Sequence, residues 1–339
     1  MTDQDHQGQY WHSSASSEVL LERARMLKNI RAFFDDRQVI EVETPLLSHH
    51  ATTDPHLDSL RSRFRDQPCY LNTSPEYAMK RLLASWRISI YQICKAFRDD
   101  ELGSLHNPEF TLLEWYRLDY DCEQLMDELT VLIETLCARS ARFLSLRGGK
   151  KIRFERLSYQ QAFENFLGIN PHRTTSAECY RFALSHGVEI PQGLGKDDVL
   201  DDWLDWLLTQ RVLPAFQKEG FTFLYDYPAS QCALAKIGRD TQGVAVARRF
   251  ELFYGEIELA NGFHELTDPA EQLQRFKLEN KARKQRGKDF VCIDNHFIAA
   301  LEAGLPECSG LALGLDRVLM VLLGVENIEQ VLSFSWANA

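Results

Sequence analysis

The chain has 339 residues, of which 45% are hydrophobic and 26% are charged, a composition typical of a globular protein. No run approaches the ~18 apolar residues of a membrane span, and the polar first residues lack the basic and apolar stretches of a secretory signal. The formal net charge of −11 disfavours a dedicated tRNA or DNA binder, which usually presents basic surface to phosphates. We expect a cytoplasmic protein whose eight cysteines are free thiols, with no spacing typical of a zinc site.

The first part of the chain opens with a polar tail over residues 1–17, which we expect to be flexible. Apolar residues at helical spacing and short alternating runs then predict helices and strands in turn. The expected elements are a helix over 18–36, a strand over 39–43, a helix that starts at Ser74-Pro75-Glu76, and strands over 91–98 and 110–118 that form a long-looped antiparallel hairpin.

Residues from about 120 to 235 show helical stretches and turn clusters but no recognisable chemistry, which predicts an inserted helical segment. Antiparallel units interleaved with helices predict an α+β fold, in which an antiparallel sheet is flanked by helices. The expected elements are helices over 123–139, 159–166 and 197–216 in the insertion, a hairpin over 242–268, a helix over 271–286, a strand over 311–315 and a helix over 316–323.

Glu251 and Glu258 are the first candidates for a functional site. If Tyr254-Gly255 is a two-residue turn, the two carboxylates lie directly across a hairpin, with Cβ atoms ~5 Å apart. Like charges so placed repel unless a cation lies between them, and hard oxygen ligands suit Mg²⁺. The alternative is that both side chains point to solvent at the end of a hairpin.

A second candidate is the strand face that carries Phe110, Leu112, Glu114 and Tyr116, which alternate with a period of two. An aromatic ring, a carboxylate and a phenol on one face suit a site that stacks a flat ring and holds a cation. Arg98 ends the partner strand, where a guanidinium can bind a phosphate in bidentate fashion. The alternative is a mixed strand that faces the surface.

Glycines flank a third candidate, Arg317, which lies in the first turn of a helix after Gly310 and Gly314. A cation at that position opposes the helix dipole, which is more easily explained if Arg317 binds an anion. An ordinary glycine-rich turn explains this stretch equally well.

A fourth candidate is the stretch Asn261 to Glu265. Asn261, Phe263 and Glu265 share a strand face but Glu258 is out of phase with them, and a bulge at Asn261-Gly262 would bring all four to one site. With other acidic and aromatic side chains they would form a pocket that fits an alkyl chain ending in ammonium. The further members of this pocket are Glu76, Glu114 and Tyr116.

Together these pieces resemble, in order, the three motifs of class II aminoacyl-tRNA synthetases, and the stretches are similar to the lysyl branch. The segment from residue 18 to Pro45 resembles motif 1, the dimer-forming element, so the resemblance implies a homodimer. Ile93–Arg98 with His106–Thr111 resembles motif 2, and Gly314–Arg317 resembles motif 3. The likeness covers most of the chain outside 120–235, which would make 18–339 a single catalytic domain. Segments 73–76, 248–251 and 258–266 also match lysyl-type stretches.

The resemblance implies a role for each matching residue. Arg98 would hold the α-phosphate of ATP and the substrate carboxylate, and Arg317 would hold the γ-phosphate, so both would be catalytic. Glu251 and Glu258 would coordinate Mg²⁺. The other residues implied to contact ATP are Asp100, Asn107, Phe110 (stacked on adenine), Leu252 and Gly314. The residues implied to bind the amino acid are Ser74, Glu76, Glu114, Tyr116, Glu258, Asn261, Phe263, Glu265 and Ala312, with Tyr116 and Glu265 at the ε-ammonium group.

Two departures from the lysyl enzymes point to one branch of the family. Lysyl-tRNA synthetases carry an anticodon-binding barrel before motif 1, for which residues 1–17 leave no room, and they usually have glycine at the position of Ala312. One added methyl group in a packed pocket shifts substrate preference by ~1–3 kcal/mol. Both departures resemble the freestanding lysyl-synthetase paralogues that attach (R)-β-lysine to a lysine of elongation factor P. The stretch Arg98–Glu101 differs from their usual Arg-Asn-Glu-Glu, which leaves open whether Asp100 or Glu101 contacts the nucleotide.

The resemblance implies a two-step reaction, in which the substrate carboxylate attacks the α-phosphorus of ATP and an acceptor amine then attacks the adenylate. Positioning and charge neutralisation by the arginines and the metal need no protein nucleophile. Two alternatives remain. One is a minimal lysyl-tRNA synthetase that charges tRNA, although its acidic charge makes tRNA an unlikely partner. The other is an inactive paralogue that binds and regulates a partner.

Overall fold

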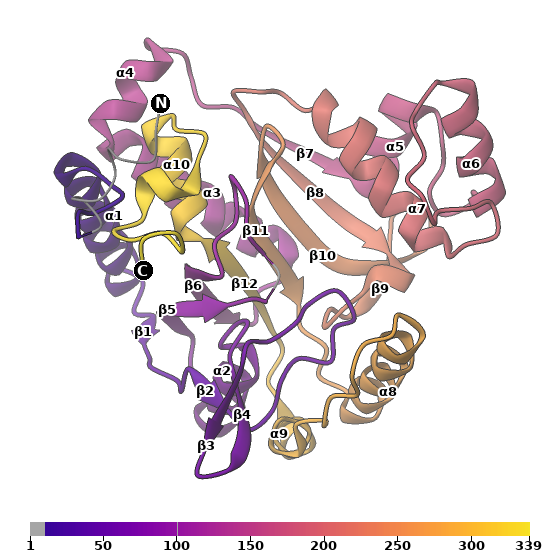
Figure 1. The fold of residues 1–339 in the computed structure, drawn as a ribbon, viewed down its shortest axis with the longest axis horizontal. Helices are drawn as coiled ribbons and strands as arrows, with labels where there is room; N and C mark the ends of the chain where they lie inside the picture. The colour runs from indigo at the N-terminus through magenta and orange to yellow at the C-terminus, as the bar shows by residue number, and fades with distance from the viewer. Residues whose placement is uncertain (1–10, 100) are drawn as a thin grey trace, which may run out of the picture. The chain divides into compact units, whose positions relative to one another are not determined.

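The computed structural model describes residues 11–99 and 101–339, which form two compact units. Unit 1 comprises the residues up to Lys151 and those from Thr267 onward, and unit 2 runs from Ile152 to Leu266. Figure 1 labels their helices and strands. No helix in the described part of the chain is long and apolar enough to cross a membrane.

Unit 1 contains an antiparallel core sheet. Its strand order is β1-β5-β6-β12, in which only the short β1 runs parallel to its neighbour, and a second small sheet has the order β2-β4-β3. The elements of unit 1 are α1 (Ser17–Asp35), β1 (Ile40–Glu41), β2 (Leu47–Ser48), β3 (Arg61–Phe64), β4 (Gln67–Leu71), α2 (Glu76–Trp86), β5 (Ile90–Phe97), β6 (Glu109–Leu118), α3 (Cys122–Arg139), α4 (Ala141–Arg147), α8 (Pro269–Gln285), α9 (Asn295–Gly304), β12 (Cys308–Gly314), α10 (Leu315–Leu323) and a 3-10 turn (Ile328–Val331).

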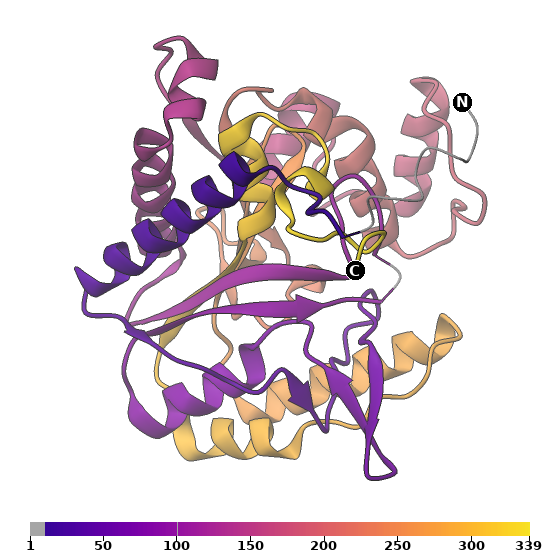
Figure 2. The same cartoon turned by 60° about the vertical axis from the view of Figure 1, so that its left-hand side comes forward.

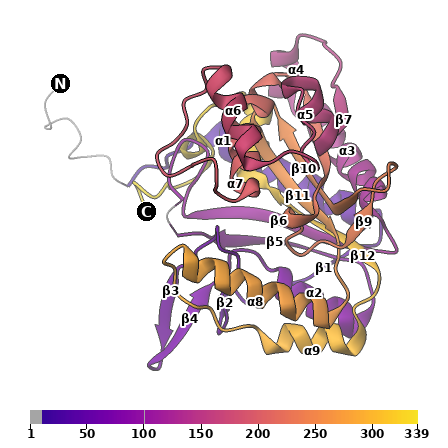
Figure 3. The same ribbon diagram turned by 90° about the vertical axis from the view of Figure 1, so that its right-hand side faces the viewer.

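Helices cover both faces of β5 and β6 in unit 1. α1 and α3 lie on one side of these strands, and α2, α8 and α9 lie on the other (Figure 2; Figure 3). On the α1 side, Phe34 stacks on Tyr91 with ring centres 4.4 Å apart, and the Trp115 indole donates a hydrogen bond of 3.0 Å to Glu128 of α3. These aromatic contacts fix the rear face of the sheet and so hold the opposite face in register.

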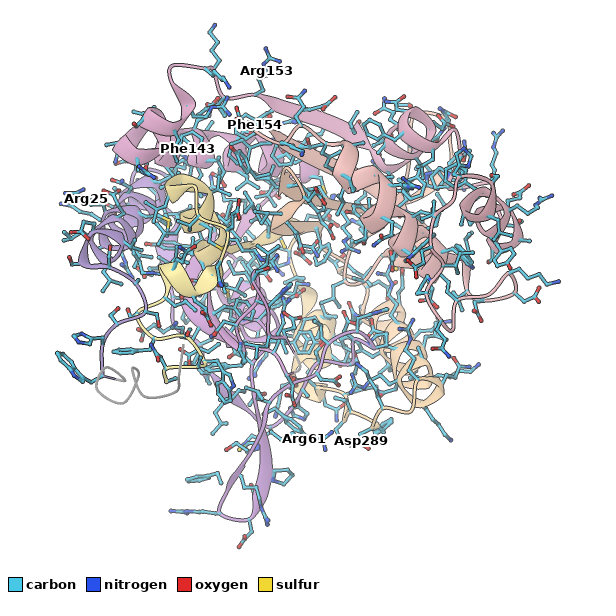
Figure 4. All side chains as sticks on the ribbon, turned by 45° about the horizontal axis from the view of Figure 1, so that its top comes forward. Arg25, Arg61, Phe143, Arg153, Phe154 and Asp289 are labelled. Carbon is cyan, nitrogen blue, oxygen red and sulfur yellow. The ribbon has the colours of Figure 1, made fainter. Side chains whose placement is uncertain are left out.

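Two peripheral segments of unit 1 are tied down by polar contacts. Ser14 N and Ser13 Oγ both donate to the Ser333 carbonyl, at 2.8 and 2.9 Å, and so link this part of the expected tail to the C-terminal segment. That residues 1–17 form a flexible tail stays a prediction. Residues 1–10 of that expected tail lie outside the described part of the chain. Arg61 of β3 forms an ion pair of 2.7 Å with Asp289, beyond the end of α8 (Figure 4).

Unit 2 combines an antiparallel ribbon with a helical layer (Figure 1). Its strand order is β11-β10-β8-β7, in which β7 runs parallel to β8, and β9 also pairs with β10. The helices pack on these strands through a core that includes Tyr159, Phe163 and Trp203. The elements of unit 2 are β7 (Phe154–Ser158), α5 (Tyr159–Leu167), α6 (Ser176–Ser185), α7 (Leu200–Leu207), a π turn (Leu208–Val212), 3-10 turns (Leu213–Ala215 and Ala229–Gln231), β8 (Phe221–Pro228), β9 (Ile237–Arg239), β10 (Ala245–Tyr254) and β11 (Ile257–His264).

The predicted α+β class is confirmed, and most expected elements lie within a few residues of their predicted positions. Two differences matter. The segment 120–235 is not wholly helical, because it contributes β7 and β8 to a sheet, and the strand expected over 39–43 is reduced to two residues. That residues 18–339 act as one catalytic domain stays a prediction.

Candidate active site

One face of the β5–β6–β12 sheet carries the first group of candidate residues. The register places Gln92 opposite Glu114 and Glu114 opposite Ala312, so these three side chains form a row across three strands. β12 presents only small residues on this face, because Gly310 and Gly314 flank Ala312 at alternate positions. The β12 part of this face therefore carries no bulky side chain.

Arg98 stands at the end of β5 beside the aromatic ring of Phe110. Its guanidinium carbon lies 5.1 Å from the ring centre, and its Nη1 contacts Glu101 at 3.4 Å. Arg98 Nε has no hydrogen-bond partner among the described residues. A buried donor that lacks a protein partner suits a ligand anion. Arg98 and the Phe110 ring thus lie side by side, and their roles in binding phosphate and adenine stay predictions.

Arg317, in the first turn of α10, is held against the loop between β5 and β6. Its Nε donates to the Leu105 carbonyl at 3.2 Å, and its Nη2 lies 2.7 Å from His106 Nε2. The preceding Asp316 accepts a hydrogen bond of 2.7 Å from Thr111 N and pairs with Arg23. The start of α10 and the hairpin loop are therefore locked together.

The Asn107 amide is occupied by protein contacts. Its Nδ2 donates to the Glu109 carbonyl at 2.7 Å and its Oδ1 accepts from Trp336 N at 3.0 Å. The side chain thus ties the hairpin loop to the C-terminal segment, and its contact with ATP stays a prediction. Asp100, for which a nucleotide contact was also predicted, lies outside the described residues.

An acidic cluster lies at the start of α2 and on β6. Glu76 N donates to Ser74 Oγ at 3.1 Å, and the Glu76 carboxylate binds Lys80 Nζ at 2.6 Å. The Tyr116 hydroxyl donates to Glu114 Oε1 at 2.7 Å. Burial, and then the nearby Glu76 carboxylate, raise the pKa of Glu114 to about 8. A cation that approached Glu114 would reverse this shift, because an opposite charge favours the ionised form.

The β10–β11 hairpin of unit 2 carries the second group, in a register that differs from the predicted one. Glu251 lies opposite Asn261, not Glu258, and Glu258 lies opposite Phe253. The turn falls at Gly255-Glu256, one residue later than expected, because Gly255 supplies a φ of +54° at the first central position.

A β-bulge at Leu259 corrects the phase of this strand. The pairing passes from Leu252–Ala260 to Phe253–Glu258, so Leu259 has no opposite partner and is the extra residue. Glu258 therefore shares a face with Glu251 and Asn261. We predicted from the sequence a bulge that brings Glu258 and Asn261 onto one face, but the predicted position, Asn261-Gly262, is wrong.

Arg249 is the centre of the second group. It forms an ion pair with Glu251, donates to Asn261 Oδ1 at 3.2 Å, and lies 5.9 Å from the Phe263 ring centre. Burial raises the pKa of Glu251 to about 7; Arg249 opposes this shift and the Glu258 carboxylate adds to it. The cluster thus holds two carboxylates and one guanidinium on one strand face.

The remaining predicted residues of this group occupy less direct positions. The Leu252 side chain is fully buried on the opposite strand face from Glu251, so only its backbone could contact a nucleotide. Glu265 is buried just past the end of β11, where its backbone forms an isolated β-bridge with Ala235.

Three residues near these groups were missed from the sequence although each carries a signal. Lys80 follows Glu76 by four residues on a helix, the spacing of an intrahelical ion pair. Gln92 and Arg249 have the strand phase of Arg98 and Glu251, respectively, so a period of two indicates that each shares its partner's face.

The fold and the motif residues define a class of protein. The sequence profile of the class II tRNA synthetases (D, K and N) matches residues 6–338, and the chain belongs to this family. Curated relatives named elongation factor P–(R)-β-lysine ligase match it over nearly its whole length. The relative from Vibrio cholerae is 44% identical over 97% of this chain and 98% of its own. Those from Salmonella arizonae and Klebsiella pneumoniae are 44% and 43% identical, each over 96% of this chain and 97% of their own.

Proposed function

We propose that this chain activates (R)-β-lysine with ATP and transfers it to the ε-amine of a lysine in elongation factor P. The named relatives support this proposal. Within the chain, the observation that carries it is the buried Glu114 carboxylate on the β5–β6–β12 face. A carboxylate in that position is costly unless the substrate brings a positive charge. A lysine-type amino acid provides that charge as an ammonium group.

The first step is adenylation. The substrate carboxylate attacks the α-phosphorus of ATP, the bond to the bridging oxygen breaks, and pyrophosphate leaves. Arg98 binds the α-phosphate and the carboxylate, and Arg317 binds the γ-phosphate. Phe110 stacks on the adenine. Catalysis is then positioning and charge neutralisation by fixed guanidinium groups.

Glu251 and Glu258 are suited to hold the Mg²⁺ that accompanies ATP. They lie on one strand face, and the Glu258 carboxylate contributes to the raised pKa of Glu251. Among the described residues no group of three or more His, Cys, Asp or Glu side chains is arranged as a metal site. A cation at Glu251 and Glu258 therefore needs phosphate and water oxygens as further ligands, which is the usual coordination of Mg²⁺. When bound, the ion neutralises charge on the phosphates.

The second step forms an amide with the acceptor. The ε-amine of the acceptor lysine attacks the carbonyl carbon of the adenylate, and AMP leaves. The amine loses its protons before or during attack, because an ammonium group has no lone pair. We also propose that the protein works in the cytoplasm, where elongation factor P acts.

A homodimer through α1 and β1 is part of the proposal. Motif 1 is the dimer element in the family that this chain resembles. Leu21 of α1 and Ile40 of β1 are large apolar side chains that are exposed in the single chain. Sedimentation of the purified protein at micromolar concentration tests this, and a monomer would contradict it.

Label transfer tests the function as a whole. Radiolabelled (R)-β-lysine or α-lysine is incubated with ATP, Mg²⁺ and the enzyme, with elongation factor P and total tRNA as parallel acceptors. We expect label on the protein, more from β-lysine than from α-lysine. Label on tRNA alone would indicate a minimal lysyl-tRNA synthetase. No exchange of pyrophosphate into ATP with either amino acid would indicate an inactive paralogue.

A further inference from the structure

Two buried acceptor atoms face each other on the β5–β6–β12 sheet. Gln92 and Glu114 are each 2% exposed, and they occupy directly opposite positions on β5 and β6, where Cβ atoms lie ~5 Å apart. Gln92 Oε1 and Glu114 Oε2 have no hydrogen-bond partner among the described residues. When Glu114 is ionised both atoms are acceptors, and buried acceptors without a partner are costly, so the pair points to a donor that arrives with the ligand that ionises Glu114.

The other polar atoms around this pair are already engaged. The Glu114 carboxylate accepts the Tyr116 hydroxyl at Oε1 and also interacts with the Ser74 hydroxyl and the Lys80 ammonium group. The Gln92 amide interacts with the neighbouring Cys94 thiol. Ala312, on the third strand, adds only a methyl group beside the row. A group that satisfies both acceptors must carry several N–H donors and tolerate a carboxylate, and a primary ammonium has three donors and a positive charge.

The strand geometry identifies which ammonium group of the substrate can reach this position. Gln92 precedes Arg98 by six residues along an extended strand, which separates their backbones by ~20 Å. The β-amine of β-lysine stays beside the carboxylate that Arg98 binds, whereas the terminal amine lies at the far end of the alkyl chain. Only the terminal amine can approach Gln92 while the carboxylate remains at Arg98.

We propose that the Gln92 side-chain carbonyl binds the terminal ammonium group of the amino-acid substrate, together with the Glu114 carboxylate. Gln92 is then a specificity-determining residue, and this assignment rests on the proposed function. A neutral amide at this position has a clear use. The amide adds an acceptor without adding a second negative charge. A carboxylate at the position directly opposite would be repelled by the Glu114 carboxylate.

The test is the variant Gln92→Met, which keeps the length of the side chain and removes the acceptor. Amino-acid-dependent exchange of pyrophosphate into ATP is measured with three substrates. They are (R)-β-lysine, its analogue without the terminal amine, and its analogue without the β-amine. Where an analogue turns over too slowly, its inhibition constant against (R)-β-lysine replaces kcat/KM. Gln160→Met, a buried glutamine on α5 outside both groups, is the matched control.

We expect Gln92→Met to lower kcat/KM about 10- to 100-fold for (R)-β-lysine and for the analogue that retains the terminal amine. The analogue without that amine, and the KM for ATP, should change less than about twofold. Equal losses with all three substrates would show a merely structural role and overturn the proposal. No loss, or a loss confined to substrates with the β-amine, would overturn it as well. If the proposed function itself is wrong, the unmodified enzyme shows no exchange with (R)-β-lysine, an outcome distinct from all of these.

Discussion

The raised pKa of Glu114 leads to a measurable coupling between substrate binding and proton release. With a pKa of about 8, Glu114 is about nine-tenths protonated at pH 7 in the empty protein. An ammonium group beside it favours the ionised form and lowers that pKa. Binding of (R)-β-lysine at pH 7 should therefore release close to one proton. The dissociation constant should fall about tenfold for each pH unit between pH 6 and 8.

The same group makes the empty protein less stable as the pH rises. Its pKa is raised on folding, from 4.5 to about 8, so the folded protein binds more protons than the unfolded chain between these values. The favourable contribution of this group to the free energy of unfolding is fully present below pH 4.5 and is lost as the pH rises through 8. Its size is on the order of 5 kcal/mol. Saturating (R)-β-lysine should offset the loss, because the ligand stabilises the ionised carboxylate in the folded protein.

Isothermal titration calorimetry in buffers of different ionisation enthalpy measures the proton count directly. Wild type, Glu114→Gln and Glu128→Gln are titrated with (R)-β-lysine at pH 6, 7 and 8. Glu128 is a buried carboxylate of α3, which packs on the opposite face of the same sheet, so its variant should release protons as the wild type does. Glu114→Gln should bind more weakly and without pH dependence. The reasoning is refuted if the wild type releases no proton at pH 7, or if Glu114→Gln releases as many.

Three further predictions concern the arginines and the rear face of the sheet. Arg249→Gln leaves the buried Glu251 carboxylate without its cation and should cost ~3–5 kcal/mol in urea unfolding. Arg248→Gln, which breaks a more exposed ion pair, should cost less than ~1 kcal/mol. Similar costs would show that the buried pair has no special weight. Arg98→Lys should lower kcat/KM for pyrophosphate exchange ~100- to 1,000-fold with an unchanged Tm, and a matching loss of Tm would mean a structural role instead. Trp115→Phe deprives Glu128 of a buried donor and should cost ~1–3 kcal/mol, again by urea unfolding, while a neutral result would deny that hydrogen bond any role.

Local patterns predicted the parts of the fold that depend on neighbours in sequence. The helix at residues 18–36 and the hairpin of β5 and β6 were predicted because apolar spacing and a polar loop are visible within short windows. The face that carries Phe110 and Glu114 followed from a period of two. The same rule places Gln92 on the face of Arg98, but the residue was missed because strand phase alone does not mark a glutamine as functional; its buried, unpartnered oxygen does.

Features that depend on distant pairing could not be predicted in the same way. β8 is nearly continuous in apolar and aromatic residues, because much of it is buried, so it shows no alternation that would mark a strand. Its partner β7 begins 67 residues earlier in the chain and runs parallel to it. No local pattern encodes that pairing. Both strands were therefore included in a predicted helical insertion.

The register of β10 and β11 failed for a different reason. The prediction placed the turn from a Tyr-Gly pair, but glycine takes the first central position and glutamate the second. Moving a two-residue turn by one residue shifts the pairing by two residues, so Glu258 stays on the face of Glu251 but lies opposite Phe253. The bulge at Leu259 then brings Asn261, which is three residues from Glu258, onto that same face.

The bulge at Leu259 also sets a rule for how this segment can change over evolution. Glu258 and Asn261 are three residues apart, so a regular strand would place them on opposite faces. Loss of Leu259 would make Leu252–Ala260 and Phe253–Glu258 consecutive pairs, and Glu258 would stay on the face of Glu251 and Asn261. Descendants that keep the activity can therefore lose this one residue together with the bulge. A family member that keeps the three-residue spacing but pairs the residue at position 259 in a regular ladder would be a strong candidate for a lost or altered function.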